Sequence, residues 1–281
     1  MKDLPVVSIV TPSYNQAQFL EEAIRSVLEQ DYPHIEYIIY DGGSTDGSVE
    51  IIKNYERHLA YWVSEKDKGQ SAAINKGWKR AAGQIYTWLN SDDKLEPGAV
   101  RTVVKAFQDN PHAGVVHGDL CFLDREGHEL GLAHGALSDF DRLLRDGQDH
   151  VFQPGSFFRA VLVNQVGLLD ETLHMSMDYD LLLRLAQVSE MVYVPRVLAC
   201  YRIHAATKSS LLTEHHQQET SLVRARYGGR YLLKPRLRYL AYRCFHITPK
   251  FVKTWFRRWR NSPTDRVYLQ SEKNTTNKER S

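Results

Sequence analysis

Residues 7–48 read VSIVTPSYNQAQFLEEAIRSVLEQDYPHIEYIIYDGGSTDGS, and this stretch decides the fold. A short β-branched run at 6–11 predicts a buried strand, and apolar residues at helical spacing predict a helix over 16–30. A second strand is expected at 35–40, followed by a glycine-rich turn. The order strand, helix, strand predicts parallel strands joined by a right-handed crossover.

The same alternation continues through the first ninety residues. Ser44 or Asp46 is a candidate cap for a helix after the glycine-rich turn. The pattern then predicts a strand at 61–63, a helix at 70–82 and a strand at 85–89. These elements predict an α/β fold.

Polar residues gather where three of the predicted strands end. These ends are 11–15, 41–46 and 90–93. Because ligands of open α/β sheets bind at the carboxyl ends of the strands, we expect a binding site there.

The second half of the chain is less regular. It predicts a helix at 97–109, a strand at 115–123 that leads into a hairpin, and a short helix at 178–187. Two closing strands are expected at 192–194 and 198–203.

The composition is that of a globular protein with one large domain or one domain and an appendage. The chain has 281 residues, of which 42% are hydrophobic and 25% charged, and its net charge is +2. The charge is uneven, because no acidic residue lies between Glu219 and Asp265 while a dozen lysines and arginines do.

The cysteines are few and far apart, at Cys121, Cys200 and Cys244, and no CxxC pair occurs. This pattern argues against a disulfide framework and a structural zinc site, and favours a reducing, cytoplasmic compartment. The apolar run near the N-terminus is too short for a signal peptide or a membrane span. We therefore expect any membrane contact to be peripheral, on the inner face.

The quoted stretch, followed by LNSDD at 89–93, resembles the family 2 glycosyltransferases of the GT-A fold, and the similarity covers about 6–209. The resemblance implies a Rossmann-like domain over 1–210 with a mixed, mainly parallel sheet, divided into a nucleotide-binding half (1–93) and an acceptor half (94–210). It also implies inverting transfer of a sugar from a nucleotide sugar, with UDP favoured over GDP or dTDP. The acceptor would be a saccharide or a lipid-linked hydroxyl, as in bacterial polysaccharide or lipopolysaccharide assembly.

Asp41 ends a predicted buried strand, where a carboxylate can accept a hydrogen bond from a nucleobase. The resemblance implies that Asp41 reads the uracil ring, with Thr11, Pro12 and Tyr14 beside the nucleotide. Alternatively, Asp41 and Asp46 organise the glycine-rich turn. A calcium loop is not indicated, because its twelve-residue ligand spacing is absent.

The segment Asn90-Ser91-Asp92-Asp93 resembles the DxD-type metal site of the family, with Asn90 in place of the first aspartate. A departing diphosphate needs its charge neutralised, which Mg²⁺ or Mn²⁺ held by carboxylates provides. Asn90 could still bond a ribose hydroxyl, and either Asp92 or Asp93 could be the direct ligand. The alternative is a capped helix start before Pro97.

The segment MSMDYDLLLRL at 175–185 supplies a candidate general base. An acceptor hydroxyl must lose its proton as it attacks, and a positioned carboxylate is the usual base. Asp178 matches the catalytic aspartate of the family, whereas Asp180 is expected to cap or pair locally. Both could also be present only because acids favour a helix N-terminus.

The segment YRIHAATKSS at 201–210 resembles the closing segment of related transferases, in which a histidine reaches the metal or the diphosphate. The resemblance implies His204 as a metal ligand and Arg202 as a diphosphate contact. A lone histidine is also often a plain surface or core residue.

Two further segments support the resemblance. Residues 64–83 imply that Asp67, Lys68 and Asn75 line the nucleotide pocket, although Ala72 stands where many relatives carry an acid. FQPGSFFRA implies Gln153 in the sugar and acceptor pocket, unless its Pro-Gly turn merely leads into a strand.

Two other enzyme classes would carry motifs of their own near the N-terminus. A nucleotidyltransferase would show a basic, glycine-rich phosphate loop, and a dinucleotide oxidoreductase would show GxGxxG after the first strand. The chain has neither feature. The remaining alternative is a catalytically inactive scaffold of the same fold. The presence of all four candidate site aspartates argues against it; they are Asp41, Asp92, Asp93 and Asp178.

The basic stretch at 211–260 is expected to be a helical extension. Its arginines, lysines and aromatic residues suit contact with an anionic membrane through 220–260, packing on the domain, or, least favoured, nucleic acid. We expect no nucleic-acid partner. Residues 261–281 form a polar tail that we expect to be disordered.

Overall fold

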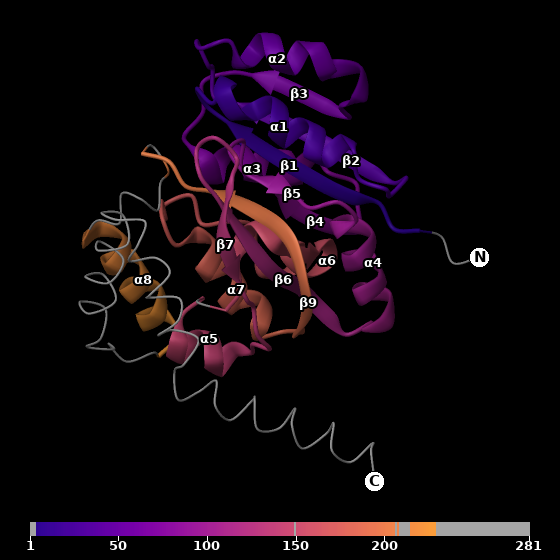
Figure 1. Ribbon diagram of the computed structural model, residues 1–281. Coiled ribbons are helices and arrows are strands. Elements are labelled where there is room, and N and C mark those ends of the chain that lie inside the picture. Colours follow the sequence, from indigo (N-terminus) through magenta and orange to yellow (C-terminus); the bar gives the residue numbers. More distant parts are fainter. Residues whose placement is uncertain (1–3, 149, 206, 208–213, 229–281) are drawn as a thin grey trace. The chain divides into compact units, whose positions relative to one another are not determined.

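The computed structural model describes residues 4–148, 150–205, 207 and 214–228, all within one unit that spans 1–230. In these residues nine strands form one mixed sheet, ordered β3-β2-β1-β4-β8-β6-β9-β5, with β7 paired to β6 (Figure 1). The strands are β1 Val7–Ser13, β2 Ile35–Asp41, β3 Tyr61–Ser64, β4 Ile85–Trp88, β5 Lys94–Leu95, β6 Ala113–Leu123, β7 Glu129–Ala133, β8 Ser156–Arg159 and β9 Glu190–Arg202.

The α-helices are α1 Ala17–Leu28, α2 Ser48–Tyr55, α3 Gln70–Arg80, α4 Ala99–Asp109, α5 Phe140–Asp146, α6 Ala160–Val166, α7 Met177–Ala186 and α8 Glu214–Arg226. Short 3-10 helices occur at η1 Glu56–His58 and η2 Gln153–Gly155. The helices and strands expected in the first ninety residues are all present, with ends shifted by a few residues. The α/β prediction is confirmed.

The N-terminal part of the sheet is parallel, as the alternation of elements requires. β1 pairs in parallel with both β2 and β4, and β2 pairs in parallel with β3. The carboxyl ends of β1, β2 and β4 therefore meet at one edge. The loops after them carry the polar segments singled out in the sequence.

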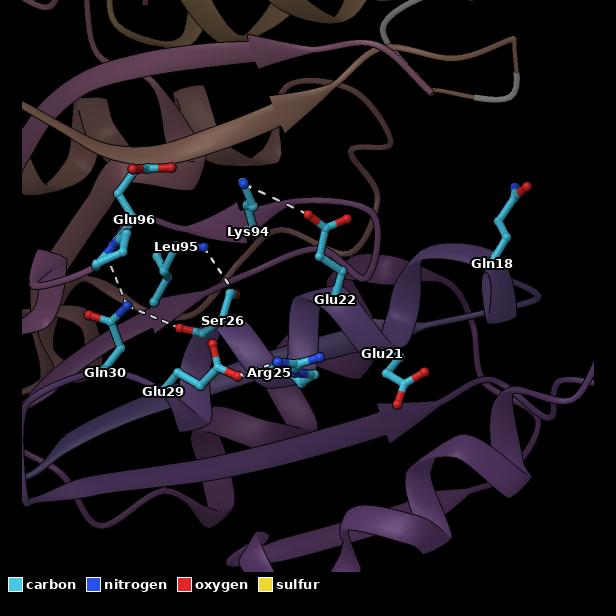
Figure 2. A pocket seen from close by; sticks show the side chains of 11 residues that line it. Gln18, Glu21, Glu22, Arg25, Ser26, Glu29, Gln30, Lys94, Leu95 and Glu96 are labelled. Carbon is cyan, nitrogen blue, oxygen red and sulfur yellow. Dashed lines mark hydrogen bonds and ion pairs between the residues drawn. The ribbon is translucent and has the colours of Figure 1, made fainter. Parts of the chain in front are cut away.

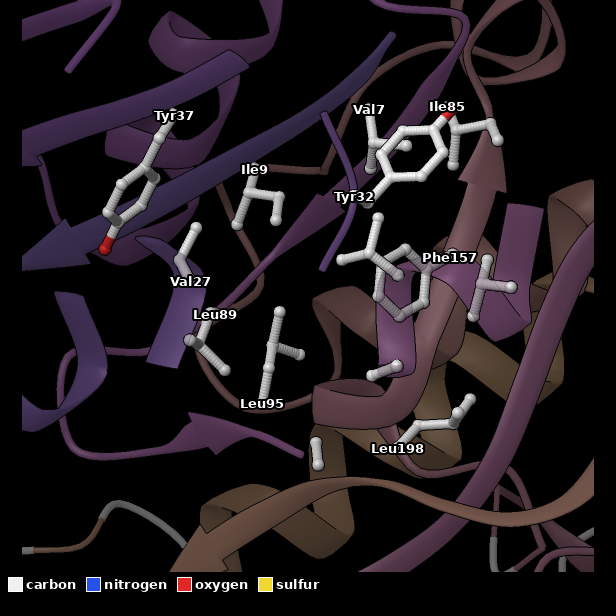
Figure 3. Packing of buried hydrophobic residues seen from close by; sticks show 14 of the residues in the cluster. Val7, Ile9, Val27, Tyr32, Tyr37, Ile85, Leu89, Leu95, Phe157 and Leu198 are labelled. Carbon is white, nitrogen blue, oxygen red and sulfur yellow. The ribbon is translucent and has the colours of Figure 1, made fainter. Parts of the chain in front are cut away.

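Helices cover both faces of this sheet, and the two-residue period of the strands divides the core between them. Ile9 belongs to one apolar cluster with Leu20 and Val27 of α1, whereas the next residue, Val10, belongs to another with Trp78 of α3. Figure 3 shows Ile9 and Val27 directed into the first cluster. Each fully buried apolar side chain contributes about 1.5–3 kcal/mol, so these clusters fix the helices against the strands.

The second half departs from the expected elements in two ways. The strands expected at 192–194 and 198–203 are one continuous strand, β9, which pairs in parallel with β6 and takes up two register shifts opposite Asp119. The short strand β5 was not predicted, because it has only two residues and takes its pairing from the distant β9. The strand β8 follows Pro154-Gly155 directly, as in the alternative interpretation of that turn.

The start of the predicted basic extension packs on the domain. Val223 of α8 is fully buried, and the Glu219 carboxylate accepts hydrogen bonds from the backbone N–H groups of His174, Met175 and Ser176 at 2.7–3.1 Å. Packing thus accounts for 214–228, while the remainder of 211–260 and the tail at 261–281 lie outside the described residues. Among the helices that the structure describes, none has the length and apolar character needed to span a membrane.

Candidate active site

A cavity of about 540 Å³ opens at the carboxyl ends of β1, β2 and β4. Its wall is built by the end of β1 and the β1–α1 loop, the loops after β2 and β3, the start of α3 and the segment after β4, with Tyr201 from the end of β9 and Thr207 from beyond it. The lining residues are Pro12, Ser13, Tyr14, Gln16, Gly42, Lys66, Asp67, Gly69, Gln70, Ala73, Asn90, Ser91, Asp92, Tyr201 and Thr207.

Asp92, which lines the cavity, contacts His204 although the two residues are distant in the sequence. His204 Nε2 lies 3.1 Å from Asp92 Oδ2, and the His204 ring packs 4.7 Å from the ring of Phe19. The His204 side chain is 4% exposed and that of Asp92 16% exposed. A backbone hydrogen bond to Thr207 Oγ1 also fixes the start of the His204 segment. His204 is not a lining residue, so the pair places an imidazole in contact with a carboxylate of the cavity wall.

Asp93 points into the protein, away from the cavity. It is 1% exposed, and its two oxygens accept hydrogen bonds from the backbone N–H of Arg202 at 3.1 Å and the side-chain amide of Asn90 at 2.9 Å. Burial, together with the neighbouring charge of Asp92, holds the pKa of the Asp93 carboxyl well above its ordinary value. The prediction of Asp93 as a direct metal ligand is therefore corrected, because Asp92 alone of the two lines the cavity.

Arg202 is a structural residue and does not line the cavity. Its guanidinium is 2% exposed and donates to Glu22 of α1, to the carbonyl of Asp92 at 3.0 Å and to the carbonyls of Asp124 and Arg125 at 3.3 Å. With its N–H groups used in this way, Arg202 ties α1 and the turn after β6 to the Asp92 segment. This arrangement replaces the predicted diphosphate contact, and Tyr201 is the neighbour that reaches the cavity.

Asn90 lines the cavity within a chain of side-chain amides. Gln70 Nε2 donates to Asn90 Oδ1 at 2.7 Å, and Asn90 Nδ2 contacts both Asp93 Oδ2 at 2.9 Å and Gln153 Oε1 at 3.4 Å. Gln153 is 9% exposed and anchors on the Trp88 carbonyl at 2.9 Å. Gln153 thus supports Asn90 from behind, and this corrects its predicted place in the sugar pocket wall.

Asp41 organises the loop after β2. It is 1% exposed, and its carboxylate accepts hydrogen bonds from the backbone N–H groups of Gly43 and Ser44 and from the hydroxyls of Ser44 and Ser64, at 2.5–3.1 Å. This is the turn role considered in the sequence, and it places Gly42 rather than Asp41 on the cavity wall. Recognition of a base by Asp41 stays a prediction.

Asp46 holds the starts of two helices. Its Oδ2 accepts from the N–H of Ala17, the first residue of α1, at 2.9 Å, and its Oδ1 accepts from the N–H of Ser48, the first residue of α2, at 3.1 Å. Of the two candidate caps in the sequence, Asp46 is the one that reaches helix N–H groups. Ser44 Oγ bonds to Asp41 and accepts from the N–H of Asn15 instead.

Of the residues at the end of β1 that were predicted to lie beside the nucleotide, some line the cavity and one lies in the core. Pro12 and Tyr14 line the cavity, and the Tyr14 side chain is 63% exposed at its rim. Thr11 is fully buried and its hydroxyl lies 3.0 Å from the Tyr37 hydroxyl. The predicted nucleotide contact of Thr11 is therefore corrected to a core hydrogen bond.

The residues predicted between β3 and α3 are also only partly at the cavity. Asp67 lines it and accepts from the Gly69 N–H at 2.7 Å, whereas Lys68 is exposed and Lys66 takes its place on the wall. Asn75 is 3% exposed, and its amide exchanges hydrogen bonds with the backbone of Leu169 at 2.9 and 3.0 Å. The nucleotide role predicted for Lys68 and Asn75 is thus corrected.

Asp178 lies in the first turn of α7, as predicted, but outside the lining of this cavity. Its Oδ1 accepts from the Tyr179 N–H at 2.8 Å and its Oδ2 from Gln148 Nε2 at 2.7 Å. Burial raises the pKa of Asp178, against the opposing effects of these donors and of His216. Asp180 pairs with Arg184 at 2.8 Å, which confirms its expected local role.

The segment before α7 lies against the start of α3. Ser71, the residue after the cavity-lining Gln70, donates from its hydroxyl to the Leu173 carbonyl at 3.4 Å. Leu173 begins the turn that leads into α7 and Asp178. The loop that carries the candidate base is therefore attached to a helix that builds the cavity wall.

A second hollow, of about 510 Å³, lies between α1 and β5 (Figure 2). Its charged side chains largely pair with one another: Arg25 with Glu29 at 2.8 Å and Lys94 with Glu22 at 3.7 Å. Gln30 donates to the carbonyl of Glu96 at 2.9 Å and so ties α1 to β5. These contacts hold α1 against the segment that follows Asp92.

Lys66, Gln70, Tyr201 and Thr207 are cavity residues that the sequence did not single out. Gln70 could have been noticed, since it opens a predicted helix beside a predicted strand end. Lys66 and Thr207 lie on loops after β3 and β9, and Tyr201 lies at the end of β9 itself. Their positions follow from tertiary pairing and not from a local pattern.

The Asp92–His204 pair fits a divalent cation. No cluster of three or more His, Cys, Asp or Glu side chains suited to a metal occurs in the residues that the structure describes. A nucleotide-dependent cation needs fewer protein ligands, because substrate phosphate oxygens and water complete its coordination. Carboxylate oxygen suits Mg²⁺ and Mn²⁺, and an imidazole nitrogen in the same set favours Mn²⁺ of the two.

Residues 8–157, more than half of the chain, match the model of the family described as glycosyl transferase family 2. The chain therefore belongs to glycosyl transferase family 2 and is a glycosyltransferase. An uncharacterized glycosyltransferase of Rickettsia prowazekii is 30% identical over 227 residues, which cover 76% of this chain and 70% of the relative. One from Mycobacterium tuberculosis is 32% identical over 204 residues, covering 70% and 75%.

Solved structures share the GT-A-type fold. S. aureus TarS 1–349 in complex with UDP-GlcNAc matches with a TM-score of 0.62 at 18% identity, over 78% of this chain and 65% of that one. The mannosyltransferase PcManGT from Pyrobaculum calidifontis, in complex with GDP-Man and Mn²⁺, also has a TM-score of 0.62 at 18% identity, over 98% and 81%. At this identity the likeness establishes the fold.

Proposed function

We propose that this chain transfers a sugar from a UDP-sugar to a hydroxyl group of a saccharide or lipid-linked acceptor, with inversion and with the help of Mn²⁺ or Mg²⁺. The observation that carries the proposal is that Asp92, in the wall of a cavity at the carboxyl ends of parallel strands, is in contact with His204. Two relatives of this fold are described in complex with nucleotide sugars, one of them also with Mn²⁺. An inactive scaffold would have no need to keep such a pair in place.

The donor half of the reaction is assigned to the cavity. Tyr14 offers an exposed ring at the rim, on which a base can stack, and Asp67 and Asn90 offer acceptors and donors for polar groups of the nucleoside. Lys66 adds a positive charge on the same wall. A cation bound by Asp92 and His204 would neutralise the charge that develops on the leaving diphosphate.

The acceptor half is assigned to Asp178. In inversion by direct displacement, the acceptor hydroxyl attacks the anomeric carbon, the bond to the diphosphate breaks, and the hydroxyl proton passes to a base. We assign this base to the Asp178 carboxylate, in the first turn of α7, because a carboxylate can accept the proton of an attacking hydroxyl. A pKa raised by burial makes it a stronger base than an exposed aspartate.

The test is a panel of UDP-, GDP- and dTDP-sugars, scored for release of nucleoside diphosphate with and without Mn²⁺, followed by transfer to an acceptor identified by mass spectrometry. We expect metal-dependent release from UDP-sugars and loss of transfer of at least about 100-fold in Asp178→Asn, the low end for loss of a general base. Asp141→Asn is the matched control, since Asp141 also lies in the first turn of a helix but is exposed.

Two outcomes would contradict the proposal. Absence of any nucleoside diphosphate release across the panel would favour the inactive scaffold. Full transfer by Asp178→Asn would show that another group takes the proton.

We also propose that the protein works on the cytoplasmic side of a bacterial membrane, in polysaccharide or lipopolysaccharide assembly. The support is the basic and aromatic composition of 229–260, which suits an anionic lipid surface. Within 220–228, Val223 is buried, Arg224 donates to the Tyr179 hydroxyl and Arg226 pairs with Asp170, while Leu222 is exposed.

A further inference from the structure

Gln148 contacts the candidate base from a different part of the chain. It lies just beyond α5, and its Nε2 donates to Asp178 Oδ2 at 2.7 Å across thirty residues of sequence. The backbone carbonyl of Gln148 accepts from the Val151 N–H at 3.0 Å, which closes a turn at this point. The side chain is therefore presented to α7 by a constrained loop.

The other end of the same amide has no role in the fold. Gln148 Oε1 is buried and has no hydrogen-bond partner among the described residues. A buried acceptor without a partner costs stability, so an apolar side chain of the same size would serve packing as well or better. The one contact that accounts for a glutamine here is the contact with Asp178.

The direction of that hydrogen bond selects one state of the carboxylate. An amide nitrogen can only donate, so Asp178 Oδ2 must accept, and an ionised carboxylate does so best. The Tyr179 N–H occupies Oδ1 in the same way at 2.8 Å. Both hydrogen bonds favour the ionised carboxylate, which is the state required of a base that is about to take a proton.

We propose that Gln148 is a positioning residue for the general base: its amide holds the Asp178 carboxylate ionised and in one orientation for the acceptor hydroxyl. This inference rests on the proposed function, because it assumes that Asp178 accepts the proton. Gln148 itself does not touch the reacting atoms in this assignment.

The groups that face Asp178 come from three segments. They are Gln148 from the loop after α5, the Tyr179 N–H from α7 and His216 from α8. Burial lowers the pKa of His216, and Asp178 opposes that effect. The effect of His216 on the pKa of Asp178 is therefore the same in the wild type and in variants that change Gln148 alone.

The experiment measures kcat and KM as a function of pH for the full chain, with Gln148→Leu, Gln148→Glu and the exposed Gln165→Leu as control. Removing the donor withdraws support from the ionised form, so the pKa of Asp178 rises and the acid limb of kcat moves to higher pH. We expect a shift of about one pH unit in Gln148→Leu, with kcat lowered roughly ten-fold near the limb and donor KM unchanged. Gln148→Glu, which adds a like charge, should shift the limb at least as far.

Thermal unfolding separates positioning from a structural role. Gln148→Leu is expected to lower the unfolding temperature at neutral pH only slightly, because the lost support of the ionised Asp178 is offset in part by removal of an unpaired buried oxygen. An unmoved acid limb in both variants overturns the inference, as does a loss of kcat that merely follows a lower unfolding temperature. If Gln148→Leu does not fold, the position of the acid limb of kcat in the isosteric Gln148→Glu tests the inference instead.

The failure of this inference differs from that of the proposed function. If Asp178→Asn is inactive but the Gln148 variants keep the wild-type profile, only the positioning role falls. If Asp178→Asn retains full transfer, the proposed base falls first and the Gln148 inference falls with it.

Discussion

At the scale of single residues, His204 carries the most specific prediction for the cation. Its Nε2 lies 3.1 Å from Asp92 Oδ2 in a nearly water-free position. We expect His204→Ala to raise the Mn²⁺ concentration for half-maximal nucleoside diphosphate release by at least about ten-fold, the smallest change usual at metal sites. Titration of the release assay with Mn²⁺ measures this.

The exposed His112 provides the control, as His112→Ala removes an imidazole without touching the cavity. An unchanged half-maximal Mn²⁺ concentration in His204→Ala would remove the histidine from the cation site.

Residue types at strand ends could be predicted from the sequence, but the direction of each side chain could not. Asp92 and Asp93 are neighbours with the same chemistry, and only the pairing of β5 with β9 turns one to the cavity and the other to the Arg202 N–H. Thr11 and Asn75 were misplaced for the same reason, since their partners Tyr37 and Leu169 lie on other elements.

At the scale of elements, α8 supports the loop that leads to the candidate base. Its Glu219 carboxylate takes three successive backbone N–H groups, from His174 to Ser176, and is 5% exposed. Glu219→Ala should therefore lower the free energy of unfolding by roughly 1–3 kcal/mol, the range for removing the charged acceptor of such donors. Urea denaturation measures the change.

Gln218→Ala on the exposed side of the same helix is the comparison, and it should stay within about 0.5 kcal/mol of the wild type. If Glu219→Ala changed the free energy of unfolding as little as Gln218→Ala, water would have to accept the hydrogen bonds of the 174–176 N–H groups. The helix α8 would then not be what holds this turn.

Local patterns gave the long amphipathic elements and failed for the short ones. The helix α1 shows its apolar stripe within twelve residues, whereas β5 is two residues long and has no periodicity of its own. Two strands were expected at 192–194 and 198–203, yet one strand passes through the residues between them by shifting register against β6. Tertiary pairing overrode the local signal there.

At the scale of the whole molecule, the prediction concerns the part beyond 228. A chain that ends at Gly228 keeps every element that the structure describes, so we expect it to retain metal-dependent nucleoside diphosphate release. It should lose co-sedimentation with anionic phosphatidylserine vesicles, which the full chain should show at low salt, since most of the dozen basic residues of the C-terminal stretch are removed.

Neutral phosphatidylcholine vesicles serve as the control for charge. Equal sedimentation of the full and shortened chains with anionic vesicles would end the membrane assignment. Loss of nucleoside diphosphate release in the shortened chain would show instead that the activity of the domain requires residues 229–281.

The pairing of β5 with β9 has a consequence for how this chain can diverge. Lys94 lies opposite Cys200. The proposed cation ligands are Asp92, two residues before Lys94, and His204, four residues after Cys200. A slip of two positions between these strands would shift the two residues by about 7 Å relative to each other. Insertions and deletions should therefore be absent from 92–95 and 199–204 in active homologues, while the β6–β7 turn tolerates length changes that leave the spacing of the two ligands untouched.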